Sequence, residues 1–310
     1  MVSKGSVLRS YSEKWERMAR DPGLELTLFV PERWGRLTAE VERSLACKII
    51  LGKTVFGGKN HLHFYPFLGK SIKEARPDVL HIDEEPYSLV TFHAMSLKGS
   101  SRALFFTWQN VYKRYPPPFR WFERYNYRGA EVAIAGSSEA GDVLRRKGFT
   151  KKIFISSQYG IDPGVFKKRE EPASREKLVG GATFVVGYLG RLVAEKGLST
   201  LLRAAATLGK ECKVLLLGGG PLEGQLHQLT VRMGIEDRVL FIRNVPSFEV
   251  PRYLNYLDVL VLPSRTTRTW KEQLGRVLIE AMACEVPVIG STSGTISEVI
   301  GDAGLIFKEG

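Results

Sequence analysis

The sequence predicts an α/β protein with two doubly wound, Rossmann-like domains. Short, continuous apolar runs alternate with stretches of helical period, which is typical of a parallel sheet covered by helices on both faces. The chain has 310 residues, more than one hydrophobic core usually supports. A polar linker rich in Pro, Gly and charge lies near 165–181, so we place an N-terminal domain at 1–170 and a C-terminal domain at 171–310.

The N-terminal half follows this alternation loosely. Its predicted strands cover residues 24–31, 78–85, 102–110, 131–137 and 152–160. Its predicted helices cover residues 6–20, 86–97, 119–130 and 138–149. Doubly wound domains usually open on a strand, whereas this chain opens on a helix. We therefore expect the first strand of this domain to be missing.

The C-terminal half alternates regularly. Its predicted strands cover residues 182–190, 212–220, 238–245, 258–264, 286–291 and 303–307. Its predicted helices cover residues 198–209, 223–234, 247–257, 274–284 and 296–301. The sequence stops shortly after the last strand, so we expect both termini to be truncated.

Composition restricts the class of protein. The chain is 44% hydrophobic and 25% charged. No apolar run reaches the roughly 18 residues that span a bilayer, and the N-terminus has no apolar signal-peptide core. Its cysteines, Cys47, Cys212 and Cys284, are far apart and lack metal-ligand spacing. We expect the thiols to be reduced. We also expect a cytoplasmic protein, with peripheral binding at the inner membrane face as a second possible location.

Charge is unevenly distributed along the chain. Residues 1–169 carry 29 Lys and Arg against 17 Asp and Glu, while residues 170–310 carry 16 of each. A basic half favours an anionic partner such as a membrane surface, a lipid phosphate or a nucleic acid. Aromatic and cationic residues mix at 112–121, which suits a membrane interface or nucleic acid; a packed helix with a charged rim is the alternative.

The carboxyl ends of strands are where ligands bind in such sheets. Gly190 and Arg191 end the first strand of the second domain, and Lys196 follows five residues later. Two cations beside a glycine suit a phosphate or diphosphate, although a surface turn with solvated charges is the alternative. The glycines at 218–220 are interpreted as a tight strand-to-helix turn.

Two carboxylates, Glu272 and Glu280, flank the start of a predicted helix. Free backbone N–H groups near Leu274, Gly275 and Arg276 form a candidate anion site. Carboxylates do not bind phosphate, so hydroxyl groups are the natural partners of the two acids. A solvent-facing position is the alternative for Glu280, but its apolar neighbours argue against it.

The N-terminal domain also places polar residues at strand ends. Glu84 and Glu85 follow one strand, and Trp108 and Gln109 follow the next. We expect these four to lie at the ligand-binding edge of the sheet. A pair of histidines in the segment 61–63 has no third ligand at suitable spacing, so no metal site is expected.

The ordered motifs VVGYLGRLVAEKG, VLLLGGGP, DVLVLPS, EAMACEVPVIGS and GTISEVIGDAGLIF cover almost all of 182–307. With the Glu272-x7-Glu280 spacing, this combination resembles the GT-B retaining glycosyltransferases, family GT4, also called glycosyl transferases group 1. The N-terminal half is similar more loosely. The resemblance implies a GT-B fold, with two Rossmann-like domains facing a cleft.

The resemblance also implies transfer of a sugar from a nucleotide-sugar donor to a glycan or lipid-linked acceptor. By position, Arg191 and Lys196 take the donor diphosphate, Glu272 the sugar hydroxyls and Glu280 the ribose. The backbone around Leu274 and Gly275 touches the diphosphate. The resemblance places the N-terminal domain on the acceptor side, with Glu84, Glu85, Trp108 and Gln109 as its candidate residues. Donor-binding residues are then Gly190, Arg191, Lys196, Glu272, Gln273, Leu274, Gly275, Val277 and Glu280, with Glu272, Arg191 and Lys196 catalytic.

The family needs neither a metal nor a cofactor, and its mechanism is a front-face displacement with electrostatic stabilisation of the leaving group. A non-catalytic nucleotide-sugar-binding remnant of the family is an alternative. A GT-B sugar-nucleotide epimerase is another, which the two spaced glutamates argue against. A nucleic-acid-binding module is the third and least favoured.

Overall fold

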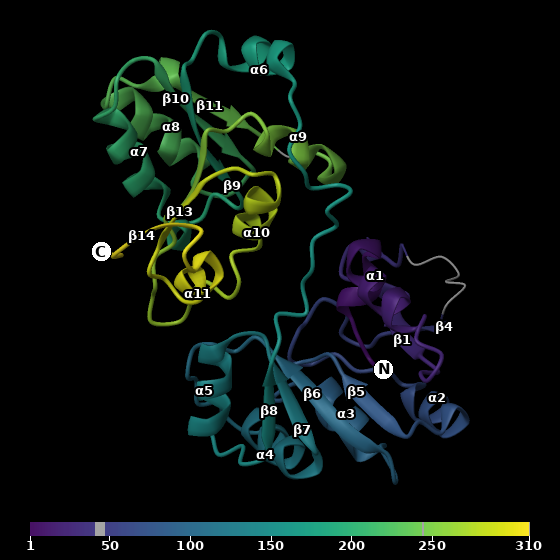
Figure 1. Ribbon diagram of the computed structural model, residues 1–310. Coiled ribbons are helices and arrows are strands. Elements are labelled where there is room, and N and C mark those ends of the chain that lie inside the picture. Colours follow the sequence, from purple (N-terminus) through teal and green to yellow (C-terminus); the bar gives the residue numbers. More distant parts are fainter. Residues whose placement is uncertain (41–46, 244, 310) are drawn as a thin grey trace. The chain divides into compact units, whose positions relative to one another are not determined.

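The computed structural model describes residues 1–40, 47–243 and 245–309 (Figure 1). The chain divides into two compact units, Met1–Gln158 and Tyr159–Gly310. The sequence analysis places this boundary later, between 170 and 171. Both units are built from parallel β-sheets and helices, so the predicted α/β class is confirmed. In the described residues no helix is long and apolar enough to cross a bilayer.

The second unit contains one six-stranded parallel sheet. Its strands are β9 (Phe184–Leu189), β10 (Cys212–Leu217), β11 (Val239–Ile242), β12 (Val259–Leu262), β13 (Val288–Ser291) and β14 (Gly304–Phe307). Its helices are α6 (Pro172–Val179), α7 (Leu198–Ala206), α8 (Glu223–Arg232), α9 (Val250–Leu254), α10 (Arg276–Ala283) and α11 (Ile296–Ile300). The strand order is β11-β10-β9-β12-β13-β14, with every pair parallel.

This order creates a topological switch point. The chain runs outward from β9 to β11, then returns to the other side of β9 and continues outward from β12 to β14. Loops after β9 and β12 therefore diverge and leave a crevice at the carboxyl edge of the sheet. Because strands such as β12 are buried along their whole length, they require apolar side chains on both faces.

The first unit has a less regular sheet. Its strands are β1 (Thr27–Pro31), β2 (Arg33–Trp34), β3 (Leu37–Thr38), β4 (Lys48–Gly52), β5 (Val79–Ile82), β6 (Arg102–Thr107), β7 (Val132–Ala135) and β8 (Lys152–Ile155). Its helices are α1 (Arg9–Met18), α2 (Leu68–Ala75), α3 (Leu89–Ser96), α4 (Phe119–Gly129) and α5 (Ser138–Arg146). Strands β5 to β8 pair in order, β1 pairs with β4, and all these pairs are parallel.

Residues 1–3 lie between β1 and β5, where the sequence analysis expects no strand. Val2 forms parallel bridges with both Phe29 and Ile82. Its N–H donates to the carbonyl of His81 at 2.9 Å, and the N–H of Asp83 donates to its carbonyl at 2.8 Å. This short segment therefore links β1 and β4 to the main sheet without forming a named strand.

Two further details differ from the predicted elements. Helix α6 lies inside the predicted linker; Pro172 at its first turn has the backbone angle that a helix start needs. Helix α10 begins at Arg276, two residues later than predicted, because Gly275 adopts a left-handed conformation with φ of 64°.

Candidate donor and acceptor sites

A pocket of about 380 Å³ opens at the switch point of the second unit. It lies at the carboxyl ends of β9 and β12 and at the start of α10. Eight of the nine predicted donor-binding residues line it, namely Gly190, Arg191, Lys196, Glu272, Gln273, Gly275, Val277 and Glu280. Leu274 is buried and is not among the residues that line the pocket. Residues eighty positions apart in the sequence therefore share one cavity.

The backbone at the pocket entrance depends on two glycines. Gly190 has φ of 151°, and a β-carbon there would lie 2.8 Å from the hydroxyl oxygen of Tyr188. Gly218 has φ of 134°, and a β-carbon there would lie 2.1 Å from the carbonyl oxygen of Gly190. The turn after β10 is thus packed directly against the turn after β9, which fixes the position of the next residue, Arg191. The Arg191 side chain is exposed.

Two residues that line the pocket form an ion pair. The Lys196 ammonium nitrogen lies 2.5 Å from Oε2 of Glu272. The same oxygen accepts a hydrogen bond of 2.7 Å from the hydroxyl of Ser264, which is fully buried. Glu272 is only 7% exposed, so its charge depends on these partners. The carboxylate is therefore held at a defined position beside a cation.

Two residues that shape this site were not predicted from the sequence, and only one of them, Trp270, lines the pocket. Trp270 lines the cavity, and its ring centroid lies 5.1 Å from the Lys196 ammonium. Ser264 fixes Glu272 from below. Both lie in or beside the polar segment 264–272, which shows no periodicity. The one sequence signal for Trp270 is its position two residues before the predicted Glu272.

Glu280 lies inside α10 and forms an ion pair of 2.8 Å with Arg276, four residues earlier. Burial raises the pKa of the Glu280 carboxyl, and the Arg276 guanidinium opposes this rise. Both side chains line the pocket. The solvent-facing alternative for Glu280 is therefore wrong, because the residue is largely buried at the cavity wall.

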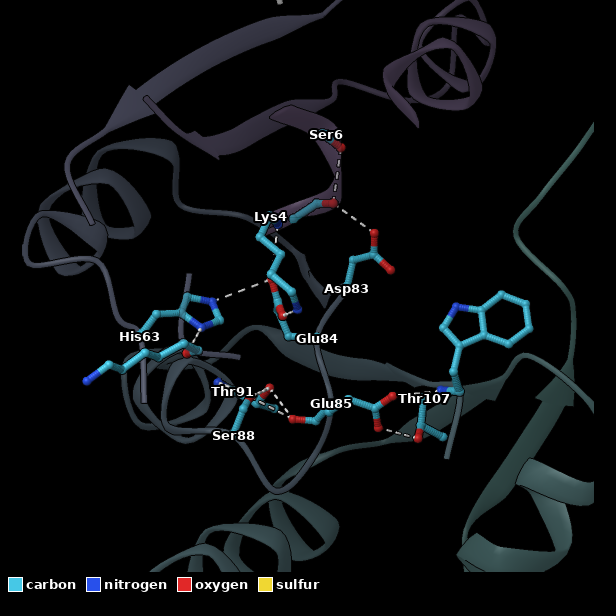
Figure 2. A network of polar contacts seen from close by, with 12 residues as sticks. Lys4, Ser6, His63, Asp83, Glu84, Glu85, Ser88, Thr91 and Thr107 are labelled. Carbon is cyan, nitrogen blue, oxygen red and sulfur yellow. Dashed lines mark hydrogen bonds and ion pairs between the residues drawn. The ribbon is translucent and has the colours of Figure 1, made fainter. Parts of the chain in front are cut away.

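The predicted acceptor-side residues lie in the first unit, and Glu84 and Glu85 belong to the polar network of Figure 2. Glu84 is 2% exposed; its Oε1 accepts from the backbone N–H of Lys4 at 3.0 Å, and its Oε2 contacts the Lys4 ammonium. His63 Nε2 lies 3.7 Å from the same carboxylate. Burial alone would raise the pKa of Glu84, but Lys4 and His63 outweigh it and lower the pKa. Glu84 thus anchors the N-terminal loop.

Glu85 points toward β6 (Figure 2). It accepts hydrogen bonds from the hydroxyl of Thr107 at 2.6 Å and from the backbone N–H of Trp108 at 2.9 Å. Burial raises the pKa of the Glu85 carboxyl, and these two donors oppose the rise. Gln109 is 8% exposed and accepts from the Lys147 ammonium at 3.1 Å. The structure thus brings Glu85 and Trp108 together and packs Gln109 against α5.

The other polar features of the first unit do not form a metal site. Across the described residues, no group of three or more His, Cys, Asp or Glu side chains could hold a metal ion. A cavity of about 950 Å³ lies beside β1 and β5, and none of the predicted site residues lines it. The chemistry available at the two carboxyl edges is hydrogen bonding and electrostatic stabilisation by Lys, Arg and carboxylate groups.

Family comparisons divide the chain in the same way as its fold. The model described as "Glycosyl transferases group 1" matches residues 170–310, and the model described as "Glycosyltransferase Family 4" matches residues 15–157.

Two curated proteins illustrate the similarity. An alpha-D-kanosaminyltransferase of Streptomyces kanamyceticus is 28% identical over 195 residues, covering 60% of this chain and 49% of that protein. A GDP-mannose-dependent alpha-(1-6)-phosphatidylinositol monomannoside mannosyltransferase of Mycolicibacterium smegmatis is 34% identical over 153 residues, covering 46% and 40%. The chain spans about half the length of the curated relatives it matches.

Solved structures agree on the fold. HepE of Anabaena, in complex with UDP and glucose, matches with a TM-score of 0.68 at 19% identity, over 100% of this chain and 85% of that one. A glycosyltransferase of Rickettsia africae matches with a TM-score of 0.75 at 17% identity, over 99% and 81%.

Proposed function

Because the chain belongs to the GT-B glycosyltransferases of the GT4 type, we propose that it moves a sugar from a nucleotide-sugar donor to a glycan or lipid-linked acceptor. We further propose that the anomeric configuration is retained. The observation that carries the proposal is the single pocket around Arg191, Lys196, Glu272 and Glu280. A site of two cations and two carboxylates suits a ligand that joins a diphosphate to two polyhydroxylated rings.

In this proposal the donor diphosphate binds Arg191 and Lys196. The backbone at the start of α10, around Gly275, contributes N–H groups to the same anion. Glu272 accepts hydrogen bonds from the hydroxyl groups of the sugar. Glu280 does the same for the ribose, with Gln273 and Val277 beside them. Charge supports this division, since a carboxylate repels phosphate but binds hydroxyl groups.

The proposed chemical step is departure of the nucleoside diphosphate from the anomeric carbon while the acceptor hydroxyl approaches the same face. Negative charge grows on the leaving oxygen, and Arg191 and Lys196 are the cations placed to stabilise it. Glu272 stabilises positive charge on the sugar ring and orients it. The acceptor proton passes to the departing phosphate oxygen, so no carboxylate has to act as a nucleophile.

We propose a peripheral location on an anionic membrane for the first unit. Residues 1–169 carry a surplus of 12 positive charges. On α4, Arg120, Arg124 and Arg128 are exposed together with Trp121, whose exposed fraction is 62%. The one acid of this helix, Glu123, is buried against Lys147. A face of cations and aromatic rings suits lipid headgroups.

A thermal-shift series with UDP-, GDP- and ADP-sugars tests the donor assignment. One class of donor is expected to raise the unfolding temperature by mass action. Arg191→Ala should abolish the shift, whereas Arg203→Ala, an exposed arginine of α7, should preserve it. If no donor stabilises the chain, or if both variants respond like the parent, the donor site is assigned wrongly.

A further inference from the structure

Trp270 contacts the cation that the proposed function assigns to the donor diphosphate. The Lys196 ammonium lies 5.1 Å from the centroid of its ring, on the pocket side. The same ammonium lies 2.5 Å from Oε2 of Glu272. Lys196 is therefore held between an aromatic face and a carboxylate.

A hydrogen-bonded turn sets the place of Trp270. The N–H of Thr267 donates to the carbonyl of Trp270 at 2.8 Å, and the N–H of Trp270 donates to the hydroxyl of Thr267 at 3.0 Å. Residues 265–269 are exposed, whereas Trp270 is half-buried. The turn thus carries the chain from solvent back to the cavity and presents the indole ring there.

The two partners of Lys196 differ in what they do to its charge. Glu272 neutralises the ammonium, and its carboxylate is the group proposed to bind sugar hydroxyls. The indole face attracts the ammonium without cancelling its charge. A lysine side chain has four flexible bonds, so an unheld ammonium would sample many positions. The ring supplies a contact that leaves the cation available to an anion.

We propose that Trp270 is a positioning residue, which holds the Lys196 ammonium in the pocket so that it meets the diphosphate of the donor. This inference rests on the proposed function, because it names how the assigned cation is oriented. It adds a residue that was not among the predicted site residues. It also gives the segment 264–272 a role in donor binding.

The first test compares Trp270→Phe with Trp270→Leu in the full chain, with the exposed Phe248→Leu as a control for loss of an aromatic ring. The probes are the nucleoside diphosphate that stabilises the parent and the corresponding nucleoside, measured by calorimetry. Trp270→Leu should weaken the diphosphate about tenfold and leave the nucleoside unchanged. Trp270→Phe should recover most of the affinity, and Phe248→Leu should match the parent.

A double variant makes the test specific to Lys196. In the Lys196→Ala background, Trp270→Leu should have no further effect on diphosphate affinity. Independent losses that add in the double variant would overturn the proposal, and so would a Phe variant as weak as the Leu variant. Each variant is first compared with the parent by thermal unfolding in the absence of nucleotide.

A readout without nucleotide separates this inference from the proposed function. After reductive ¹³C-dimethylation, which preserves the charge of lysine, the Lys196 methyl signal should show an aromatic ring-current shift that Trp270→Leu removes. No shift at Lys196 would overturn the positioning role. If the ring-current shift is present but the parent binds no nucleoside diphosphate, the proposed function is wrong although Trp270 contacts Lys196.

Discussion

Among single residues, two buried carboxylates at the proposed binding edges, Glu272 and Glu84, each have a partner of opposite charge. Glu272 and Lys196 satisfy each other within the second unit, and Ser264 completes the arrangement. In the first unit, Lys4 does the same for Glu84. Such pairs are costly to break, because removal of one partner leaves a buried charge. They therefore fix side chains at the edge where a ligand is proposed to bind.

Glu272→Gln should affect the sugar part of the donor selectively. Loss of a hydrogen bond to a charged acceptor is expected to weaken a nucleotide sugar about 10- to 100-fold. The nucleoside diphosphate alone should bind the variant within about threefold of the parent, since it lacks the transferred sugar that Glu272 is proposed to bind. Calorimetry with both ligands measures this, and Glu195→Gln is the control on a neighbouring acid. Equal losses for both ligands would argue against the assignment.

His81 predicts a pH-dependent stability in the first unit. Burial, with help from nearby positive charges, lowers the pKa of its imidazole from 6.5 to about 3. The His81 imidazole of the unfolded chain therefore binds a proton near pH 6.5, whereas that of the folded chain stays neutral until about pH 3. Stability is full above that pH and falls as the pH drops toward 3.

Urea unfolding of the parent and of His81→Leu measures this dependence. Between pH 7.5 and pH 5, the parent should lose about 2 kcal/mol more than the variant. Because the two proteins share all other titratable groups, the contributions of these groups cancel in the comparison. Parallel pH profiles for the two proteins would show that His81 is not the responsible group.

At the scale of elements, the sequence predicted the strands of the second unit well, since strands buried on both faces must be continuously apolar. The helix starts of α7, α8 and α11 were predicted at the right residue, whereas that of α10 was not. Gly275 ends the non-helical segment before α10 through its left-handed φ of 64°, which a periodic pattern does not reveal. The sequence of 33–40 and 47–75 shows no clear period, so it does not predict β2, β3, β4 or α2.

Site residues that belong to sequence motifs could be predicted. Residues that join the site only through a tertiary contact could not. Arg191, Lys196 and the two spaced glutamates belong to ordered motifs, so their positions could be read from the sequence. Ser264 ends the motif DVLVLPS, but the motif does not show that its hydroxyl contacts Glu272. Trp270 lies in the polar loop that follows, and nothing in the sequence shows that this loop reaches Lys196. In the first unit, the predicted strands 78–85 and 102–110 each run three residues beyond the ends of β5 and β6. The sequence also did not predict that Lys4 pairs with the buried Glu84.

The loop before α11 offers a test of how an element supports the site. Gly294 has φ of 57°, and a β-carbon there would lie 2.0 Å from the carbonyl oxygen of Glu272. Gly301 has a similar φ of 52°, but a β-carbon there would meet nothing within 4 Å. Both alanine variants carry backbone strain, and only Gly294→Ala also displaces Glu272.

Gly301→Ala should cost about 1–3 kcal/mol of unfolding free energy for its backbone strain, and Gly294→Ala about 2 kcal/mol more because of the close contact. Urea unfolding measures both values. Gly294→Ala alone should also weaken the nucleotide sugar. Equal costs for the two variants would mean that the close approach at Gly294 relaxes without effect on the site.

At the scale of the whole molecule, charge and chemistry divide between the two units. The second half of the sequence is neutral and holds the pocket proposed to bind the donor, whereas residues 1–169 are strongly basic. A neutral unit around a cluster of paired charges suits a small ligand. A basic unit with exposed aromatic rings suits an extended anionic surface.

Vesicle sedimentation tests that division. The chain should bind phosphatidylglycerol vesicles and lose binding as salt is raised. Replacement of Arg120, Arg124 and Arg128 by Gln should weaken binding at least about 30-fold. The same change at Lys53, Lys59 and Lys73, which are exposed elsewhere in the unit, is the control with equal charge. An equal loss in both triple variants would show that net charge, not the α4 face, determines binding.

The central claim is that the switch-point pocket of the second unit binds the nucleotide of a sugar donor. The most direct measurement is a crystal structure of the chain with a nucleoside diphosphate. The account predicts diphosphate oxygens within about 3.5 Å of nitrogen atoms of Arg191 and Lys196, with ribose hydroxyls at Glu280. A nucleotide bound elsewhere, or one that leaves Lys196 and Arg191 without contact, would contradict it.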